Sequence, residues 1–406
     1  MNDARATRRR EFWAKMKPQA GRGSRSPLAM WFFDIDRVLL LLALLLIAIG
    51  LLAVAAGSPA SALRYSGEKV HFPPLYYFWR QLLWVMVSVP LMLFVSMLPI
   101  ATARRAALIG AAFFLACLAL VPFIGVEVNG ARRWIGVGLA QFQPSEFLKP
   151  CFVVLVAWLL SLREKEPDVP VVPISFALMA LVGALLMLQP DFGQTVIFSV
   201  IWITLLMVSG VPLRVLGMIG GLGLAGVVAA YLFYDTARIR IDAFLSRGSD
   251  DQALDHYQTD MAHATITSGG WLGTGPGGGT MKFKLPEAHT DYIFSVIGEE
   301  FGLIACAVIA LLFLMLVARV VVKLLDETDA FRLLAAAGLA TQFGAQALVS
   351  MAVNTGIAPS KGMTLPFISY GGSSLIALSG GMGLLLAFTR RNPFLVRSPY
   401  IVRWNQ

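Results

Sequence analysis

Stretches of about 18 or more apolar residues recur along the chain, separated by short polar segments. About 20 apolar residues in a helix, at a rise of about 1.5 Å each, cross a hydrocarbon core about 30 Å thick. The pattern therefore predicts an all-α integral membrane protein with about ten transmembrane helices. Their expected ranges are 38–56, 79–98, 106–125, 147–162, 173–189, 192–209, 213–234, 292–322, 332–354 and 371–389.

The composition supports this interpretation. Of the 406 residues, 57% are apolar and 14% charged, and the mean hydropathy is +0.71. A soluble core could not bury so much apolar surface, so lipid must cover part of it. We expect a disordered basic tail at 1–37, a polytopic membrane domain at 38–390 that includes a large loop at 235–290, and a second tail at 391–406.

The net charge of +9 carries information about orientation. If both termini are cytoplasmic, 21 of the 33 Lys and Arg residues lie on the cytoplasmic side, nine of them before the first helix. This excess follows the positive-inside rule and places the loop 235–290, between helices 7 and 8, outside the cytoplasm. The basic residues then attract anionic lipid rather than nucleic acid.

The first polar cluster on the predicted outer face leads into the fourth helix. Glu146 and Lys149 are three residues apart, so they meet on one helical face. They form either a structural ion pair or part of a site for a phosphate or sugar. In the second case Arg132 or Arg133, just upstream, would supply the guanidinium that suits pyrophosphate.

Two further clusters lie between helices. Asp191, in the tight turn between the fifth and sixth helices, could cap the sixth helix or belong to a site. The segment 354–374 before the last helix is either a rigid loop or a phosphate-binding one. Its only charge is Lys361, and Ser369 is a further candidate for substrate binding.

The fourth cluster lies at the exit of the large loop. Asp291 marks the start of the eighth helix, where a carboxylate meets both water and lipid headgroups. Glu299 and Glu300 lie deeper and on different faces, so we expect them to hold different neighbouring helices together. Gly269–Gly279 contains a GxGxxG match without the strand and helix of a nucleotide site, and we interpret it as a flexible hinge.

Metal-binding patterns are missing from the sequence. The three cysteines lie in or beside apolar segments, and the four histidines are scattered without an HExxH spacing. No dedicated metal site or cofactor is predicted. A divalent cation remains an alternative to Lys or Arg wherever pyrophosphate has to be neutralised.

Five motifs in this order resemble the SEDS family of cell-wall proteins, whose branches are the division-type FtsW and the elongation-type RodA. They are GARRWIG, QFQPSEFLK, QPDFGQT, LPEAHTDYIFSVIGEEFG (285–302) and PSKGMTLPFISYGGSS (359–374). The resemblance covers roughly residues 30–395, and the strings around the first helix and residues 270–302 are more similar to the division-type branch of alphaproteobacteria.

The resemblance implies a peptidoglycan glycosyltransferase that polymerises lipid II onto a lipid-linked glycan chain at the outer face of the cytoplasmic (inner) membrane. Asp291 matches the catalytic aspartate. Glu146, Lys149 and Asp191 match polar residues around the cavity, while Arg132 or Arg133, Lys361 and Ser369 are weaker substrate-binding candidates. The implied partners are an FtsI-like class B penicillin-binding transpeptidase and other division proteins at the septum.

Three alternatives stay open at this point. A lipid II flippase would also suit ten helices with polar residues at membrane depth. A scaffold that only recruits division proteins could use the basic tail. An elongation-type role in cell shape would use the same core motifs.

Overall fold

The computed structural model describes most of the chain in two compact units. Arg37–Thr389 form the larger unit, and the smaller one combines residues 1–36 and 390–406. In the smaller unit, Pro27–Asp34 form helix α2. The described residues are 27–67, 71–128, 131–136, 141–164, 166–233, 238, 242, 253–359 and 362–390.

The larger unit is a bundle of apolar helices, as predicted. Among the described residues, eight helices are long and apolar enough to cross a membrane, and two shorter apolar helices join them. Each coincides with one expected segment. They are α3 (Arg37–Tyr65), α4 (Tyr76–Met97), α5 (Ile100–Ile124), α6 (Pro144–Ser161), α7 (Val171–Leu188), α8 (Phe192–Val208), α9 (Leu213–Phe233), α12 (Ile293–Leu324), α13 (Ala330–Asn354) and α14 (Gly372–Phe388).

Smaller elements connect these helices. The hairpin of β1 (Val126–Val128) and β2 (Ala131–Trp134) departs from the all-helical expectation. The 3-10 turn η2 (Leu162–Glu164) extends α6, and helix α11 (Ala253–Ser268) and the 3-10 turn η4 (Met281–Phe283) precede α12.

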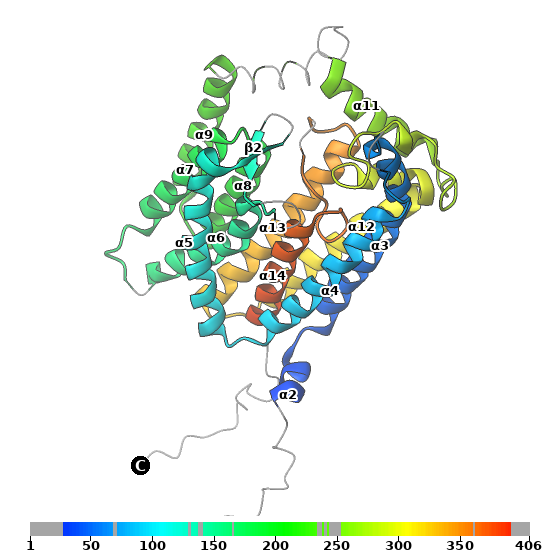
Figure 1. Cartoon of the computed structure of the whole chain (residues 1–406). Coiled ribbons are helices and arrows are strands. Elements are labelled where there is room, and N and C mark those ends of the chain that lie inside the picture. The colour runs from blue at the N-terminus through cyan, green and yellow to red at the C-terminus, as the bar shows by residue number, and fades with distance from the viewer. Residues whose placement is uncertain are drawn as a thin grey trace, which may run out of the picture. The chain divides into compact units, whose positions relative to one another are not determined.

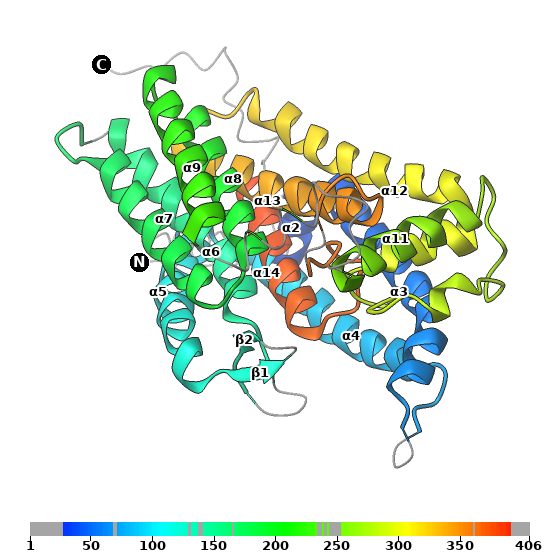
Figure 2. The same cartoon turned by 90° about the horizontal axis from the view of Figure 1, so that it is seen from above.

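Helix α14 lies in the middle of the bundle, beside α4, α6 and α13 (Figure 2). Its side chains are almost all buried. A Cβ on Gly383 would lie 2.7 Å from the Met92 carbonyl oxygen, so this glycine allows α4 and α14 to approach closely. Helix α9, in contrast, lies at the edge and presents exposed side chains, which suit a lipid-facing position.

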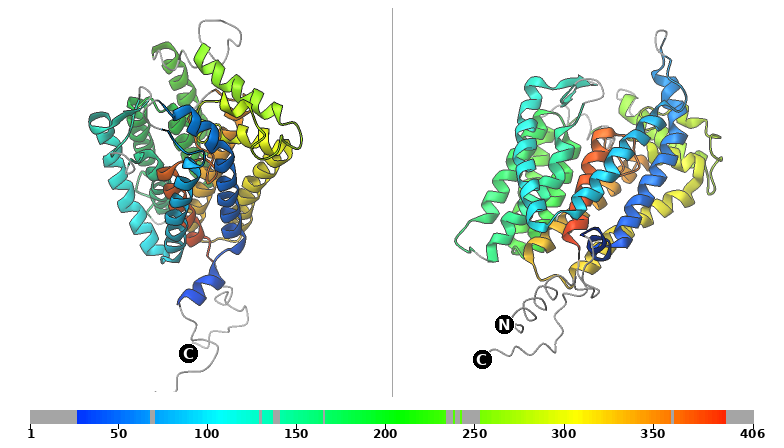
Figure 3. Two further views of the ribbon diagram at one scale, coloured as in Figure 1. Left: turned by 45° about the vertical axis from the view of Figure 1, so that its right-hand side comes forward. Right: turned by 60° about the horizontal axis from the view of Figure 1, so that its bottom comes forward.

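The elements that carry the polar clusters lie at one end of the bundle (Figures 1 and 3). The β1–β2 hairpin, α11 and the start of α12 are found there, because successive helices run in alternating directions. The α6–α7 and α12–α13 connections lie at the opposite end. That the first of these ends is extracytoplasmic stays a prediction from the charge pattern.

Helix α12 is interrupted at Gly302, which has φ 82° and ψ 175°. The preceding loop fills the interruption: the amides of Thr274 and Gly275 donate to the carbonyls of Glu299 and Glu300, at 2.9 and 3.1 Å. In return, the Leu303 amide donates to the Gly270 carbonyl at 3.0 Å. The prediction of a hinge at 269–279 was therefore wrong. Gly269 and Gly273 are packed against the α12 backbone, where a Cβ would meet the carbonyl oxygens of Gly298 and Glu300.

The paired glutamates also differ from expectation, because both bind η4 rather than two separate helices. The Glu299 carboxylate accepts hydrogen bonds from the amides of Met281 and Lys282, at 2.6 and 2.9 Å. The Lys282 ammonium forms a buried ion pair with Glu300 and donates to the Ala56 carbonyl of α3 at 3.1 Å. Sequence reasoning missed this partner because Lys282 lies in the long loop.

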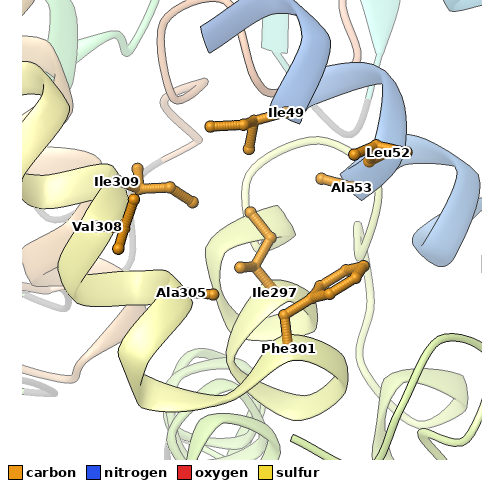
Figure 4. A pocket seen from close by; sticks show the side chains of 8 residues that line it. All are labelled: Ile49, Leu52, Ala53, Ile297, Phe301, Ala305, Val308 and Ile309. Carbon is orange, nitrogen blue, oxygen red and sulfur yellow. The ribbon is translucent and has the colours of Figure 1, made fainter. Parts of the chain in front are cut away.

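An apolar pocket of about 310 Å³ lies between α3 and α12 beside the interruption (Figure 4). Its lining residues are all apolar, so it can accept hydrocarbon but offers no partner for a sugar or phosphate. They are Ile49, Leu52, Ala53, Ile297, Phe301, Ala305, Val308 and Ile309.

Replacement of Gly302 by Ala is expected to lower the free energy of unfolding by about 2–4 kcal/mol. The backbone conformation is one that L-residues rarely adopt, and the new Cβ would lie 2.3 Å from the Trp271 carbonyl oxygen. Thermal unfolding in detergent measures the loss. Gly220→Ala in α9, where a Cβ meets nothing within 4 Å, is the matched control and should not lower the melting temperature.

Candidate functional site

The predicted catalytic residue Asp291 lies two residues before α12. Helix α12 starts at the end of the bundle that carries the β1–β2 hairpin and α11. The Asp291 side chain is half-buried. A Cβ on Gly362 would lie 3.0 Å from Asp291 Oδ2, so the carboxylate faces the segment before α14 with little space between them. Lys361, the predicted phosphate-binding lysine next to Gly362, lies outside the described residues.

The backbone at Asp291 is fixed by Asn354, the last residue of α13. The Asn354 side-chain amide donates to the Asp291 carbonyl at 2.9 Å. Its side-chain oxygen accepts from the amide and hydroxyl of Ser295, at 3.1 and 2.8 Å. This residue therefore joins the end of one membrane helix to the first turn of another, which holds Asp291 in place.

The β1–β2 hairpin places Arg132 and Arg133 in different surroundings, although the sequence could not show which of them is the better candidate for binding pyrophosphate. Successive residues of a strand point to opposite faces. Arg132 pairs with Glu127 across the hairpin at 3.5 Å, with about half of its side chain exposed. Arg133 points to the bundle and donates to the carbonyls of Gln189 and Pro190, at 3.2 and 2.6 Å. Arg133 is thus the arginine inside the site.

Asp191 caps the N-terminus of α8, which is one of the two roles that the sequence predicted for it. Its carboxylate accepts from the Gln194 amide at 3.3 Å and from the Gln143 side chain at 3.1 Å. Arg133 Nε lies 3.9 Å from the same carboxylate. Burial raises the pKa of Asp191, while the Arg133 charge opposes that shift.

Glu146 and Lys149 form the predicted ion pair, at 2.9 Å. The pair is buried, with the Lys149 residue 0% and the Glu146 residue 4% exposed. Gln194 Nε2 donates to Glu146 at 2.6 Å, and Ser374 lies 3.3 Å from the other carboxylate oxygen. Buried charges require such satisfied partners.

The ammonium of Lys149 also donates to Gln346 of α13 at 3.0 Å. Gln346 in turn donates to the Thr364 carbonyl at 3.0 Å. Lys149 is fully buried, so a substrate can reach its ammonium only if the residues that cover it move. The ion pair is therefore connected through Gln346 to the segment before α14 and helps to hold that segment in place. Direct phosphate binding by Lys149 stays a prediction.

Ser369, the last substrate-binding candidate, uses its hydroxyl within its own loop. The hydroxyl accepts from the Leu365 amide at 2.8 Å, and the Ser369 carbonyl accepts from Gln81 of α4 at 3.3 Å. The residue is 5% exposed. Its contacts shape the loop, and a contact with substrate stays a prediction.

The environment of Asp291 favours its protonated form. Burial and the negative charge of Glu287 raise the pKa of this carboxyl to about 7, and Arg133 opposes the shift. Asp191 and Glu146 also act on it electrostatically. Asp291 therefore lies within electrostatic range of the hairpin arginine and of the carboxylates at the starts of α6 and α8.

Among the described residues, no group of three or more His, Cys, Asp or Glu side chains gathers where it could hold a metal ion. Helix α13 carries a set of polar residues, amides and one hydroxyl, that the sequence interpretation did not use. On α13, Gln342, Gln346, Ser350 and Asn354 follow one another at a spacing of four residues, and all are buried. That polar stripe in an apolar helix is a signal that could have identified them.

Comparison with known proteins identifies the family. The cell cycle protein family of FtsW, RodA and SpoVE matches residues 36–393. The chain is similar to the probable peptidoglycan glycosyltransferase FtsW of Caulobacter vibrioides, with 41% identity over 92% of this chain and 93% of the relative. The probable peptidoglycan glycosyltransferase FtsW of Halorhodospira halophila is 35% identical, over 90% of this chain and 93% of that protein.

Solved structures show the same fold. A chain in a structure described as "Structural coordination of polymerization and crosslinking by a peptidoglycan synthase complex" matches with a TM-score of 0.70 and 28% identity, covering 87% of this chain and 97% of that one. The rod shape determining protein RodA of Thermus thermophilus matches with a TM-score of 0.62 and 27% identity, over 88% and 97% of the two chains. The chain is therefore a multi-pass membrane protein that belongs to the SEDS family, the family of FtsW and RodA.

Proposed function

We propose that this protein is a peptidoglycan glycosyltransferase of the division type, which polymerises lipid II into glycan strands at the outer face of the cytoplasmic membrane. The observation that carries the proposal is Asp291. Its carboxylate is half-buried, its backbone is fixed by Asn354, and Arg133 and Asp191 act on it electrostatically. The similarity to FtsW proteins supports the same activity.

In the proposed reaction, Asp291 acts as the general base. The 4-hydroxyl of the incoming lipid II loses its proton to the Asp291 carboxylate while its oxygen attacks the anomeric carbon of the lipid-linked chain. The new glycosidic bond forms with inversion as the bond to undecaprenyl pyrophosphate breaks, and the leaving group takes the electron pair. A pKa near 7 suits a base that works around neutral pH.

The leaving pyrophosphate needs positive charge beside it. Arg133 is the best-supported donor of this charge among the described residues, because a quarter of its side chain is exposed beside Asp191. Lys361 and a divalent cation remain further candidates. Lys149 would contribute through the position of the segment before α14, by way of Gln346 and Thr364.

Translocation of lipid II is the second candidate function. Alternating access requires a polar pathway that reaches both ends of the bundle. The buried charged residues described in the larger unit belong to elements that begin at the end with the hairpin and α11, which favours the enzyme. They are Glu146 and Lys149 in the first two turns of α6, Asp191 before α8, Lys282 in η4, and Glu299 and Glu300 in the first turns of α12.

The proposed partner is a class B penicillin-binding transpeptidase of the FtsI type, acting with other division proteins at the septum. A similar chain belongs to a structure described as a peptidoglycan synthase complex, which supports such an assembly. An elongation-type role is the alternative, and the greater similarity to FtsW relatives argues against it.

A reconstitution experiment tests the function. The purified full-length chain in liposomes, with and without the transpeptidase, is given lipid II in the absence of ATP. The proposal expects glycan polymer, detected by gel electrophoresis. Transfer of fluorescent lipid II to the other leaflet without any polymer would support the flippase instead. Inactivity of both kinds with the partner present would contradict both functions.

A further inference from the structure

Glu287 has an unusual backbone conformation four residues before Asp291. Its φ is +50°, in the left-handed region that non-glycine residues other than Asn and Asp rarely occupy. Holding such a residue there costs free energy, which the surrounding contacts must offset. The strain therefore needs a reason in the contacts that Glu287 makes.

Two hydrogen bonds fix the Glu287 carboxylate. The hydroxyl of Tyr65, the last residue of α3, donates to Oε1 at 2.6 Å. The Thr290 hydroxyl lies 2.9 Å from Oε2. The Glu287 carbonyl accepts from the amides of Thr290 and Tyr292, at 3.1 and 3.3 Å, so the same residue closes the turn that contains Asp291.

The turn is further held by His289. Its ring lies against those of Tyr77 and Tyr370, with centroids 4.1 and 5.1 Å apart, and its carbonyl accepts from the Tyr370 amide at 2.9 Å. Burial lowers the pKa of His289 to about 4, so the imidazole is neutral around pH 7. The turn therefore carries one fixed negative charge besides Asp291, and that charge is on Glu287.

We propose that Glu287 is a positioning residue whose carboxylate, fixed by Tyr65 and Thr290, sets the pH at which Asp291 becomes a base. This inference rests on the proposed function of Asp291. A like charge nearby disfavours ionisation of a carboxyl, and the two hydrogen bonds hold the Glu287 charge in one position within the turn that contains Asp291.

Other charges act electrostatically on Asp291 from neighbouring elements. Among the described residues they are Arg133 on β2, Asp191 before α8 and Glu146 in α6. Asp191 and Glu146 act in the same sense as Glu287, but each has a cationic neighbour, Arg133 or Lys149. Glu287 instead receives its hydrogen bonds from neutral hydroxyls, so it is the acid whose neutralisation should change the pKa of Asp291 most.

The test is the pH dependence of lipid II polymerisation by Glu287→Gln in the full-length chain with its transpeptidase. In the wild type, the rate should rise as pH passes through about 7, because Asp291 loses its proton there. Removal of the neighbouring negative charge lowers the pKa of Asp291. The rise should therefore move to lower pH by about half a unit, since solvent screens charges at this partly exposed site.

Two variants separate charge from shape. Glu287→Asp keeps the charge and suits a positive φ better than Glu, so its pH profile should stay near that of the wild type. Glu166→Gln removes an exposed carboxylate at the opposite end of the bundle and should leave the profile unchanged. Thermal unfolding in detergent confirms that each variant is folded.

The outcomes distinguish this inference from the proposed function. If the wild type makes polymer and Asp291→Asn does not, the function stands. An unshifted profile for Glu287→Gln would then overturn the inference alone. So would equal shifts for Glu287→Gln and Glu287→Asp, because they would indicate a purely structural role.

Discussion

Replacement of Asp291 by Asn is expected to lower the rate of lipid II polymerisation by about 10²–10⁴-fold, the usual contribution of a general base. Asn has nearly the same shape as Asp but cannot accept the proton of the acceptor hydroxyl. Quantification of polymer made by the purified chain with its transpeptidase, under single-turnover conditions, measures the loss.

The fold of this variant should be intact, because its anchoring contact uses the backbone. Asn354 donates to the Asp291 carbonyl, which the substitution retains. Removing a half-buried, partly protonated carboxyl also leaves no buried charge without a partner. The melting temperature in detergent should therefore stay close to that of the wild type.

The matched control is Asp168→Asn, which makes the same chemical change on an exposed residue between α6 and α7. Its polymerisation rate should equal that of the wild type. If a folded Asp291→Asn variant polymerised lipid II at the wild-type rate, Asp291 could not be the general base.

Much of the fold could be predicted because the bilayer imposes a simple rule on the sequence. Each of the ten apolar runs corresponds to a helix, including the short α8 and α14. The end of α3 was missed, since it continues to Tyr65 through polar and small residues beyond the apolar run. Hydropathy detects the part of a helix that contacts lipid, and α3 extends past that part.

The interruption of α12 could not be predicted from local pattern. Gly302 lies in an apolar run that hydropathy interprets as one continuous span. The distant Gly269–Gly275 segment stabilises the broken helix by supplying hydrogen bonds to its free backbone groups. Only the three-dimensional structure shows that these two glycine-containing segments belong together.

The candidate site was found in part by its ionisable residues. Short-range geometry confirmed the Glu146–Lys149 pair and the cap made by Asp191, because spacings of three or four residues determine both. The choice between Arg132 and Arg133 required the hairpin register. The roles of Gln346 and Glu287 depend on contacts between distant segments, which a single sequence does not reveal.

Replacement of Lys149 by Met is expected to lower the free energy of unfolding by about 3–5 kcal/mol. Met fills a similar volume, but the Glu146 carboxylate would then be buried without its counter-charge. The Gln346 oxygen would also lose its donor, which weakens the support of Thr364. Thermal unfolding in detergent should show a large decrease in melting temperature, and polymerisation should fall with it.

The double variant Lys149→Met/Glu146→Gln tests the cause. The side-chain oxygen of the new Gln can still accept from Gln194, its NH2 group can donate to the Ser374 hydroxyl, and no isolated charge is left in the bundle. Replacing both members of a buried pair costs far less than removing one. The double variant should therefore recover most of the stability that Lys149→Met loses. A double variant as unstable as the single one would show that packing, rather than charge, determines the loss.

Arg132→Met provides the matched comparison, because it breaks the ion pair with Glu127 on the exposed hairpin. Pairs in water contribute about 0–1 kcal/mol, since solvent screens both charges whether or not they meet. The melting temperature should hardly change. Lys149→Met and Arg132→Met each remove one cation. The difference in burial between the two sites predicts that the fold tolerates only the loss of Arg132. Loss of either partner of the Glu146–Lys149 pair would leave the remaining charge unpaired in the low dielectric of the bundle.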